Sequence, residues 1–207
     1  MSDPEVIAGW LLLAGPVLGL IPVAHPALIS IWSMPREAFV AAVSDHRVAW
    51  AWLNGGFALA SIATTAGLLV VAGVEPDPGA AAVLLACAVG YAVGAVLWCA
   101  VLAIRTRTTP LLAPEHDVDS GAGETDRTAA RLLEAATTGL FHAFVVITAC
   151  ALVGLSAVLL LTDASPVWVA ATLLLTGTAV AIWLLRTGDV IPAVVYVPTA
   201  LLGVTLL

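Results

Sequence analysis

The histidines are the side chains of this sequence whose chemistry and spacing first suggest a site: His25, His46, His116 and His142. His25 and His142 each lie about one helical turn from the end of a long apolar stretch, so we expect them at similar depth in a membrane. Two imidazoles on different helices of a bundle can bind a haem b iron axially. His46 follows closely and could be a third partner or a donor to a haem propionate. The pattern therefore allows a haem b cytochrome that uses His25 and His142, with His46 beside them.

A zinc site is a second alternative for the same side chains. His25, His46 and His142 would bind the metal of a zinc-dependent intramembrane hydrolase. Three carboxylates in the same regions could transfer a proton: Asp45, Glu134 and Asp189. The sequence has neither HExxH nor HxxxH, so we rank zinc below haem. Interfacial histidines more often hydrogen-bond to loops and headgroups, and the sequence assigns no metal and no definite cofactor.

Motifs for other enzymatic chemistry are missing from the sequence. There is no P-loop, no GxGxxG after a strand and no GxSxG elbow. The cysteines, at positions 87, 99 and 150, lie inside apolar runs without metal-type spacing. We therefore expect a protein that binds rather than catalyses.

A few polar side chains inside the apolar stretches predict a pocket for an apolar ligand such as a lipid or a quinone. Asn54 begins a polar face that continues through Ser61 and Thr65 at helical spacing. Tyr91 and Tyr196 lie near the middle of their own stretches and offer hydroxyl groups. We expect Asn54, Tyr91 and Tyr196 either to line the pocket or to join neighbouring helices by hydrogen bonds.

Small residues recur on one face of another stretch, at Ala86, Gly90 and Gly94. Such a stripe lets two helices approach closely in lipid. It predicts either internal packing or contact with a membrane partner or a second copy of the chain.

The composition requires a membrane around these residues. Hydrophobic residues make up 61% of the 207 residues, charged residues only 10%, and the mean hydropathy is +1.08. Soluble domains are about 45–50% apolar and about 25% charged. The formal net charge of -7, with no lysine, argues against nucleic acid as a partner. The lipid bilayer is the expected surrounding, and the composition fits a small prokaryotic membrane protein.

Six stretches have nearly the length that crosses a bilayer, which is about 20 apolar residues. They are residues 6–30, 49–73, 80–104, 137–161, 167–185 and 190–207. The predicted fold is an all-α, polytopic integral membrane protein, a single domain formed by a six-helix bundle. A short amphipathic helix at the membrane surface is expected between the first two spans, and a flexible loop over residues 105–136.

The arginines test this topology. All seven lie in residues 31–48, 105–136 and 186–189, three loops on one side of a six-span bundle. The positive-inside rule makes these loops cytoplasmic, with both termini outside and the chain in the plasma membrane. Tryptophans cluster near the expected span ends, where indole rings prefer the headgroup zone: Trp10 and Trp168 outside, and Trp32, Trp50, Trp52, Trp98 and Trp183 inside.

Overall fold

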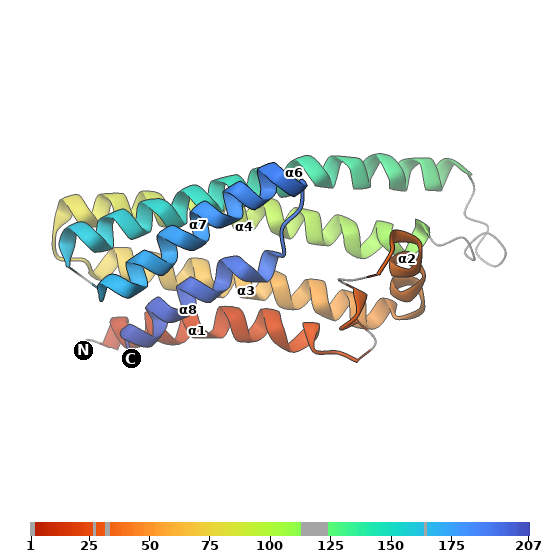
Figure 1. The fold of residues 1–207 in the computed structure, drawn as a ribbon. Helices are drawn as coiled ribbons and strands as arrows, with labels where there is room; N and C mark the ends of the chain where they lie inside the picture. The colour runs from red at the N-terminus through yellow and green to blue at the C-terminus, as the bar shows by residue number, and fades with distance from the viewer. Residues whose placement is uncertain (1–2, 27, 32–33, 113–123, 164) are drawn as a thin grey trace.

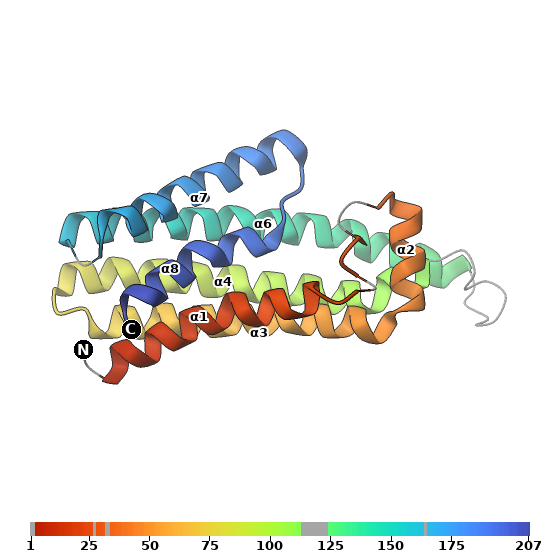
Figure 2. The ribbon, with the colours of Figure 1, turned by 60° about the horizontal axis from the view of Figure 1, so that its bottom comes forward.

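The fold is an elongated bundle of helices. The structure, a computed structural model, describes residues 3–26, 28–31, 34–112, 124–163 and 165–207, and every regular element in these ranges is helical. In chain order these are α1 (Asp3–Val23), α2 (Arg36–Asp45), α3 (Arg47–Val74), α4 (Pro78–Thr108), η2 (Thr109–Leu112), α6 (Glu124–Thr162), α7 (Val167–Thr187), η3 (Pro192–Tyr196) and α8 (Val197–Thr205). The long helices run side by side, and α2 lies across one end of the bundle (Figures 1 and 2).

Five of these helices are long and apolar enough to cross a membrane, as expected of a membrane-embedded protein. They are α1, α3, α4, α6 and α7. Large apolar side chains point outward along them, among them Leu161, 85% exposed, and Leu185, 86% exposed. A water-soluble protein rarely exposes apolar surface on this scale, whereas hydrocarbon accepts it.

The sixth expected span is shorter than the sequence predicted. Residues 190–207 were expected to form one helix, but a 3-10 turn from Pro192 precedes α8, which ends at Thr205. Proline lacks a backbone N–H, so Pro192 and Pro198 are tolerated only near the starts of these two pieces. Together the pieces extend about 24 Å, less than the roughly 30 Å of the hydrocarbon core. They run back towards the end where α1 begins (Figure 2).

Three other boundaries also differ from the sequence prediction. The first span was expected to continue to residue 30, but α1 ends at Val23, and Pro26 falls in the turns that follow. In the other direction, α4 and α6 continue past the apolar stretches, with 31 and 39 residues. At 1.5 Å per residue they measure about 46 and 58 Å, so both extend beyond a hydrocarbon core. Between α1 and α3 the chain forms a ten-residue helix, α2.

Close backbone approaches hold the bundle together. Helix α1 packs along α3, α4 packs along α6, and α8 lies against α1. A Cβ atom added to Gly94 would lie 2.7 Å from Thr148 Oγ1 on α6, and one on Gly90 would lie 3.8 Å from Ala151 Cβ. These two glycines of the predicted stripe therefore serve contacts within the chain, while Ala86 is exposed.

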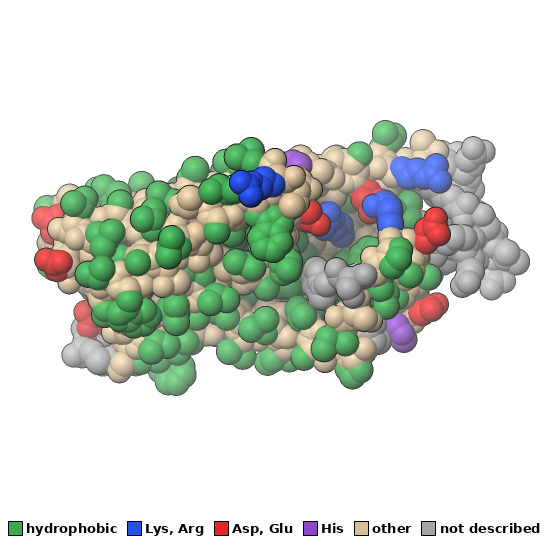
Figure 3. Space-filling view, in the orientation of Figure 1, with side chains coloured by type: hydrophobic (Ala, Val, Ile, Leu, Met, Phe, Trp, Pro, Cys, Tyr) green, Lys and Arg blue, Asp and Glu red, His purple; other side chains and the backbone are tan. Residues whose placement is uncertain are grey.

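Charged residues lie mainly towards the two ends of the bundle. Acidic turns join α3 to α4 and α6 to α7 at one end, where the Asp77 carboxylate caps α4 by accepting from Ala80 N at 2.7 Å. Arginines lie towards the other end, at the starts of α2 and α3 and at the ends of α4 and α7. Figure 3 shows an apolar surface over most of the face between them. We call the second end the arginine end.

Candidate functional site

A cavity of about 490 Å³ lies near the arginine end. It is enclosed by α2, α3, α4, α6 and the end of α7, and Figure 3 shows basic and acidic side chains gathered around the hollow. Its lining consists of Ile31, Met34, Arg36, Phe39, Trp50, Leu53, Asn54, Phe57, Trp98, Leu102, Arg105, Thr109, Glu134, Phe141, Trp183, Thr187, Asp189, Val190, Ile191 and Pro192. A volume of this size suits a small-molecule ligand. We refer to it below as the aromatic cavity.

The aromatic cavity exists because two chain segments stop being helical at its walls. Ile31 and Met34 come from the turns after α1, and Asp189 to Pro192 form the link between α7 and η3. Helix α8 and its 3-10 turn run from this link away from the arginine end (Figure 1). Non-helical backbone at membrane depth is tolerated where it lines a cavity or is covered by protein. Because the sixth element is short, it leaves part of the bundle unfilled, and this unfilled space is the cavity.

Aromatic rings form the deep wall of the cavity. Trp98 is stacked on Phe144, with ring centroids 5.1 Å apart and an interplanar angle of 14°. Phe141 lies 5.6 Å from Trp98 between ring centroids, and Phe57 lies 6.2 Å from it. Offset and tilted contacts at these distances favour aromatic side chains in fixed positions. The wall is therefore a preformed apolar surface made of flat rings.

Four charged side chains line the end of the cavity nearer the arginine end. Arg36 donates to the Glu134 carboxylate in an ion pair. The Arg105 guanidinium lies over Phe141, 5.9 Å from the ring centroid, and within electrostatic reach of Glu134 and Asp189. Asp189 Oδ1 accepts from Val190 N at 2.8 Å. The lining carries two arginines and two carboxylates, so its formal charge sums to zero.

Asn54 is the polar side chain of the sequence-predicted pocket that does line this cavity. It is only 4% exposed, on the buried face of α3. Its Nδ2 atom has no hydrogen-bond partner among the residues that the structure describes. An amide donor left unpaired in an apolar site costs free energy, which a ligand with an acceptor atom would recover.

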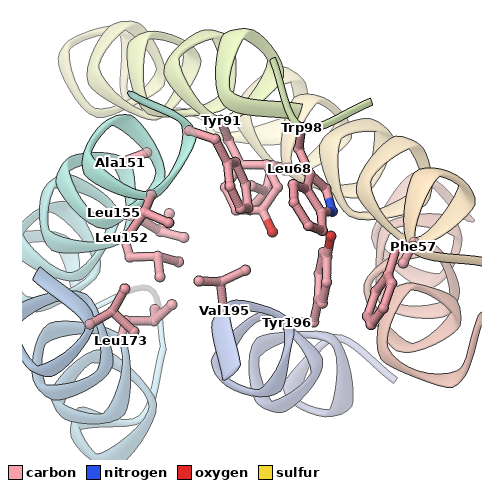
Figure 4. Close-up of a cluster of buried hydrophobic side chains, with 14 of the residues drawn as sticks. Phe57, Leu68, Tyr91, Trp98, Ala151, Leu152, Leu155, Leu173, Val195 and Tyr196 are labelled. Carbon is pink, nitrogen blue, oxygen red and sulfur yellow. The ribbon is translucent and has the colours of Figure 1, made fainter. Parts of the chain in front are cut away.

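Tyr91 and Tyr196, the other two predicted pocket residues, lie deeper in the bundle and do not line the aromatic cavity. Figure 4 shows both rings pointing into the core, with the Tyr196 hydroxyl turned towards the Trp98 indole nitrogen. The Tyr196 hydroxyl is also 2.7 Å from Ser61 Oγ. Tyr91 lines a second cavity of about 10 Å³, at the lower limit for one water molecule.

Replacing Tyr196 with phenylalanine tests whether this contact joins the short sixth element to α3. We expect Y196F to lower the free energy of unfolding by about 0.6 kcal/mol, because hydrogen bonds between helices in membranes contribute that much on average. Thermal unfolding in detergent micelles would measure the loss. Y91F is the matched control, because the Tyr91 hydroxyl has no hydrogen-bond partner in the described part of the chain. Equal losses in both variants would contradict the assignment.

The three histidines that the structure describes do not all lie together. His25 lies in the turns after α1 and lines a shallow surface depression together with His46. His142 is on α6, where its Nε2 atom is 2.9 Å from the backbone oxygen of Gly188. In the part of the chain that the structure describes, His25 lines the surface depression and not the aromatic cavity, and His142 lines neither of them.

The zinc alternative finds no support either. Within the described ranges, no three His, Cys, Asp or Glu side chains come together in a group that could hold a metal ion. The His142 contact is the hydrogen bond to a loop that interfacial histidines commonly make.

Sequence reasoning missed the residues that dominate the aromatic cavity. Trp50 and Trp98 were expected to anchor the chain in the headgroup zone, but they are only 5% and 3% exposed, so their rings pack inside the bundle rather than face lipid. Arg105 and Phe141 were not singled out, although Arg105 lies in the last turn of α4 at the arginine end. The available signal was spacing, because Trp98 and Arg105 are seven residues apart on α4 and so share a face.

Comparison with known proteins gives no further guide to this site. No family model, no curated protein and no solved structure matches the chain.

Proposed function

We propose that this chain is a multi-pass membrane protein that binds a small apolar or amphipathic molecule, a lipid or a quinone, in the aromatic cavity. The observation that carries the proposal is the preformed cavity of about 490 Å³, whose lining combines aromatic rings with charged groups. Such a lining matches a molecule that has an apolar body and a polar head. Binding, rather than catalysis, is the role that these residues support.

The depth of the cavity supports a ligand that enters from the bilayer. Helix α7 has 21 residues and is about 31 Å long, close to the thickness of the hydrocarbon core. If Val167 lies at one boundary of the core, Thr187 lies at the other. Because Thr187 lines the cavity, the cavity lies where hydrocarbon meets headgroups. An amphiphile already has this depth in the bilayer.

The orientation is part of the proposal. We place six passes in a plasma membrane, the last of them the short η3–α8 element, with both termini outside and the arginine end in the cytoplasm. Helix α2 then lies at the inner membrane surface, where Val40 and Val43 are buried against the bundle and Arg36 and Glu37 are exposed. The cavity opens at the inner leaflet.

A bulky side chain placed in the cavity should prevent the ligand from binding. We expect I191W to place an indole in the cavity, because Ile191 lines it and is 47% exposed. Mass spectrometry of an organic extract of the purified protein would measure the bound molecule. The wild-type chain should retain close to one molecule of a single amphiphile class, and the variant should lose most of it.

I182W is the matched control. Ile182 lies on α7, is also 47% exposed, and is not among the residues that line the cavity. This variant should retain the ligand as the wild-type chain does. The proposal fails if the wild-type chain carries no more amphiphile than empty micelles do, or if the two variants retain equal amounts.

A further inference from the structure

We infer that the aromatic cavity selects a neutral, flat carbonyl compound of the quinone class rather than an anionic lipid. This inference rests on the proposed function and narrows its ligand. Three observations carry it: the balance of charge in the lining, the unpaired donor of Asn54 and the aromatic walls.

The charge balance disfavours an anionic head. Arg36 is already neutralised by its ion pair with Glu134. Arg105 lies within electrostatic reach of two carboxylates, those of Glu134 and Asp189. The Arg36–Glu134 pair carries no net charge, so a phosphate or carboxylate placed beside Arg105 would meet the Asp189 carboxylate, whose repulsion offsets its attraction to the guanidinium. A neutral head meets no such repulsion.

The hydrogen-bond donors in the cavity lining favour a ligand that carries acceptor atoms. Asn54 Nδ2 is buried and has no acceptor among the described residues. The Arg105 guanidinium adds further N–H donors in the same lining. Quinone carbonyl oxygens accept hydrogen bonds and carry no charge. A quinone can therefore accept from Asn54 at depth while its ring remains among apolar side chains.

The walls favour a ring over an acyl chain. Phe57, Trp98 and Phe141 contribute flat surfaces to the lining, and their ring centroids lie 5.6–6.2 Å from one another where they pair. Aromatic rings gain energy from offset or edge contacts with another ring beyond the burial of its area. An isoprenoid tail on the quinone would extend from the cavity into the bilayer.

The test measures how tightly two tritiated probes bind to the full chain in detergent, with a scintillation proximity assay. One probe is a benzoquinone that bears a single isoprene unit, and the other is its 1,4-dimethoxybenzene counterpart, which keeps the ring and tail but lacks the carbonyls. We expect the quinone to bind about tenfold more tightly to the wild-type chain, the effect of about 1.4 kcal/mol from one buried hydrogen bond. Excess dodecyl phosphate should not displace it.

N54L should remove this preference, because leucine has a similar volume and no donor. Its quinone affinity should fall about tenfold to that of the dimethoxy probe, while the thermal midpoint of the ligand-free variant stays equal or rises. A purely structural role for Asn54 would lower that midpoint instead. T64V is the control, because Thr64 is a buried polar residue of α3 outside the cavity lining, and it should keep the preference.

The outcomes separate this inference from the proposed function. The inference is overturned, and the proposed function stands, if both probes bind equally to the wild-type chain and I191W blocks both. It is also overturned if dodecyl phosphate displaces the quinone more effectively than unlabelled quinone does, or if N54L keeps the full preference. If neither probe binds to the wild-type chain, the inference is overturned, whereas the proposed function is decided by the amphiphile that the wild-type chain, I191W and I182W retain.

Discussion

Replacing Gly203 with leucine should detach α8 from α1 and cost the protein more stability than any other single substitution considered above. A Cβ atom at this position would lie 2.9 Å from Gly9 O and 2.9 Å from Leu12 Cβ, both on α1. Neither atom belongs to the free end of a flexible side chain, so the helices themselves must separate. Overpacking of this kind costs about 1–3 kcal/mol.

The measurement is the temperature at which half of the purified protein loses its monodisperse peak in fluorescence-detected size-exclusion chromatography. At 2–4 °C for each kcal/mol, G203L should lower that temperature by about 2–12 °C, and G203A by less. G55L is the matched control, because Gly55 lies in α3 and a Cβ there meets nothing within 4 Å. That variant should be neutral or slightly stabilised, since leucine is a better helix former than glycine.

If G203L and G55L have equal midpoints, the contact between α8 and α1 contributes nothing to stability. The sixth element would then be loosely held, and its 3-10 turn would no longer explain where the aromatic cavity lies. The reciprocal position supports the contact, because a Cβ on Gly9 would meet Leu207 Cγ at 2.9 Å and Gly203 O at 3.0 Å.

The helical bundle could be predicted from the sequence because the lengths of apolar runs fix the number of long helices. Five of the six expected stretches contain helices of membrane-crossing length. What apolar length cannot show is whether an apolar run stays helical throughout. Residues 24–26 and 28–30 follow α1, and residues 190–191 precede η3. All lie in largely apolar stretches, yet they are not α-helical, because prolines at positions 22, 26 and 192 lack backbone donors.

The site was harder to predict than the fold because its walls come from elements far apart in the chain. Asn54 could be singled out, since an amide inside an apolar helix must face another helix or a ligand. Trp98 could not be placed by the same reasoning, because an indole near a span end is typical both of the headgroup zone and of a buried wall. Only the contacts between α4 and α6 decide that it stacks on Phe144.

The second prediction with a large expected effect concerns the orientation of the chain in the membrane. A single cysteine on intact cells is labelled either almost completely or hardly at all, depending on its side. In a background with Cys87, Cys99 and Cys150 changed to alanine, single cysteines would be placed at exposed positions at the two ends of the bundle. We expect P76C to react with a membrane-impermeant maleimide on intact cells, because the turn after α3 lies opposite the arginine end. A38C, on α2, should react only after the cells are made permeable.

A cysteine at position 207 decides the number of passes. Leu207 is 41% exposed and follows α8, which runs back towards the end where α1 begins. With six passes, L207C should react on intact cells as P76C does. If it reacts only after permeabilisation, the short element does not complete a crossing, and α7 is the last pass. The aromatic cavity would then lie beside a re-entrant segment, open to the cytoplasm rather than to the inner leaflet, and an amphiphile drawn from the bilayer would no longer be its natural ligand.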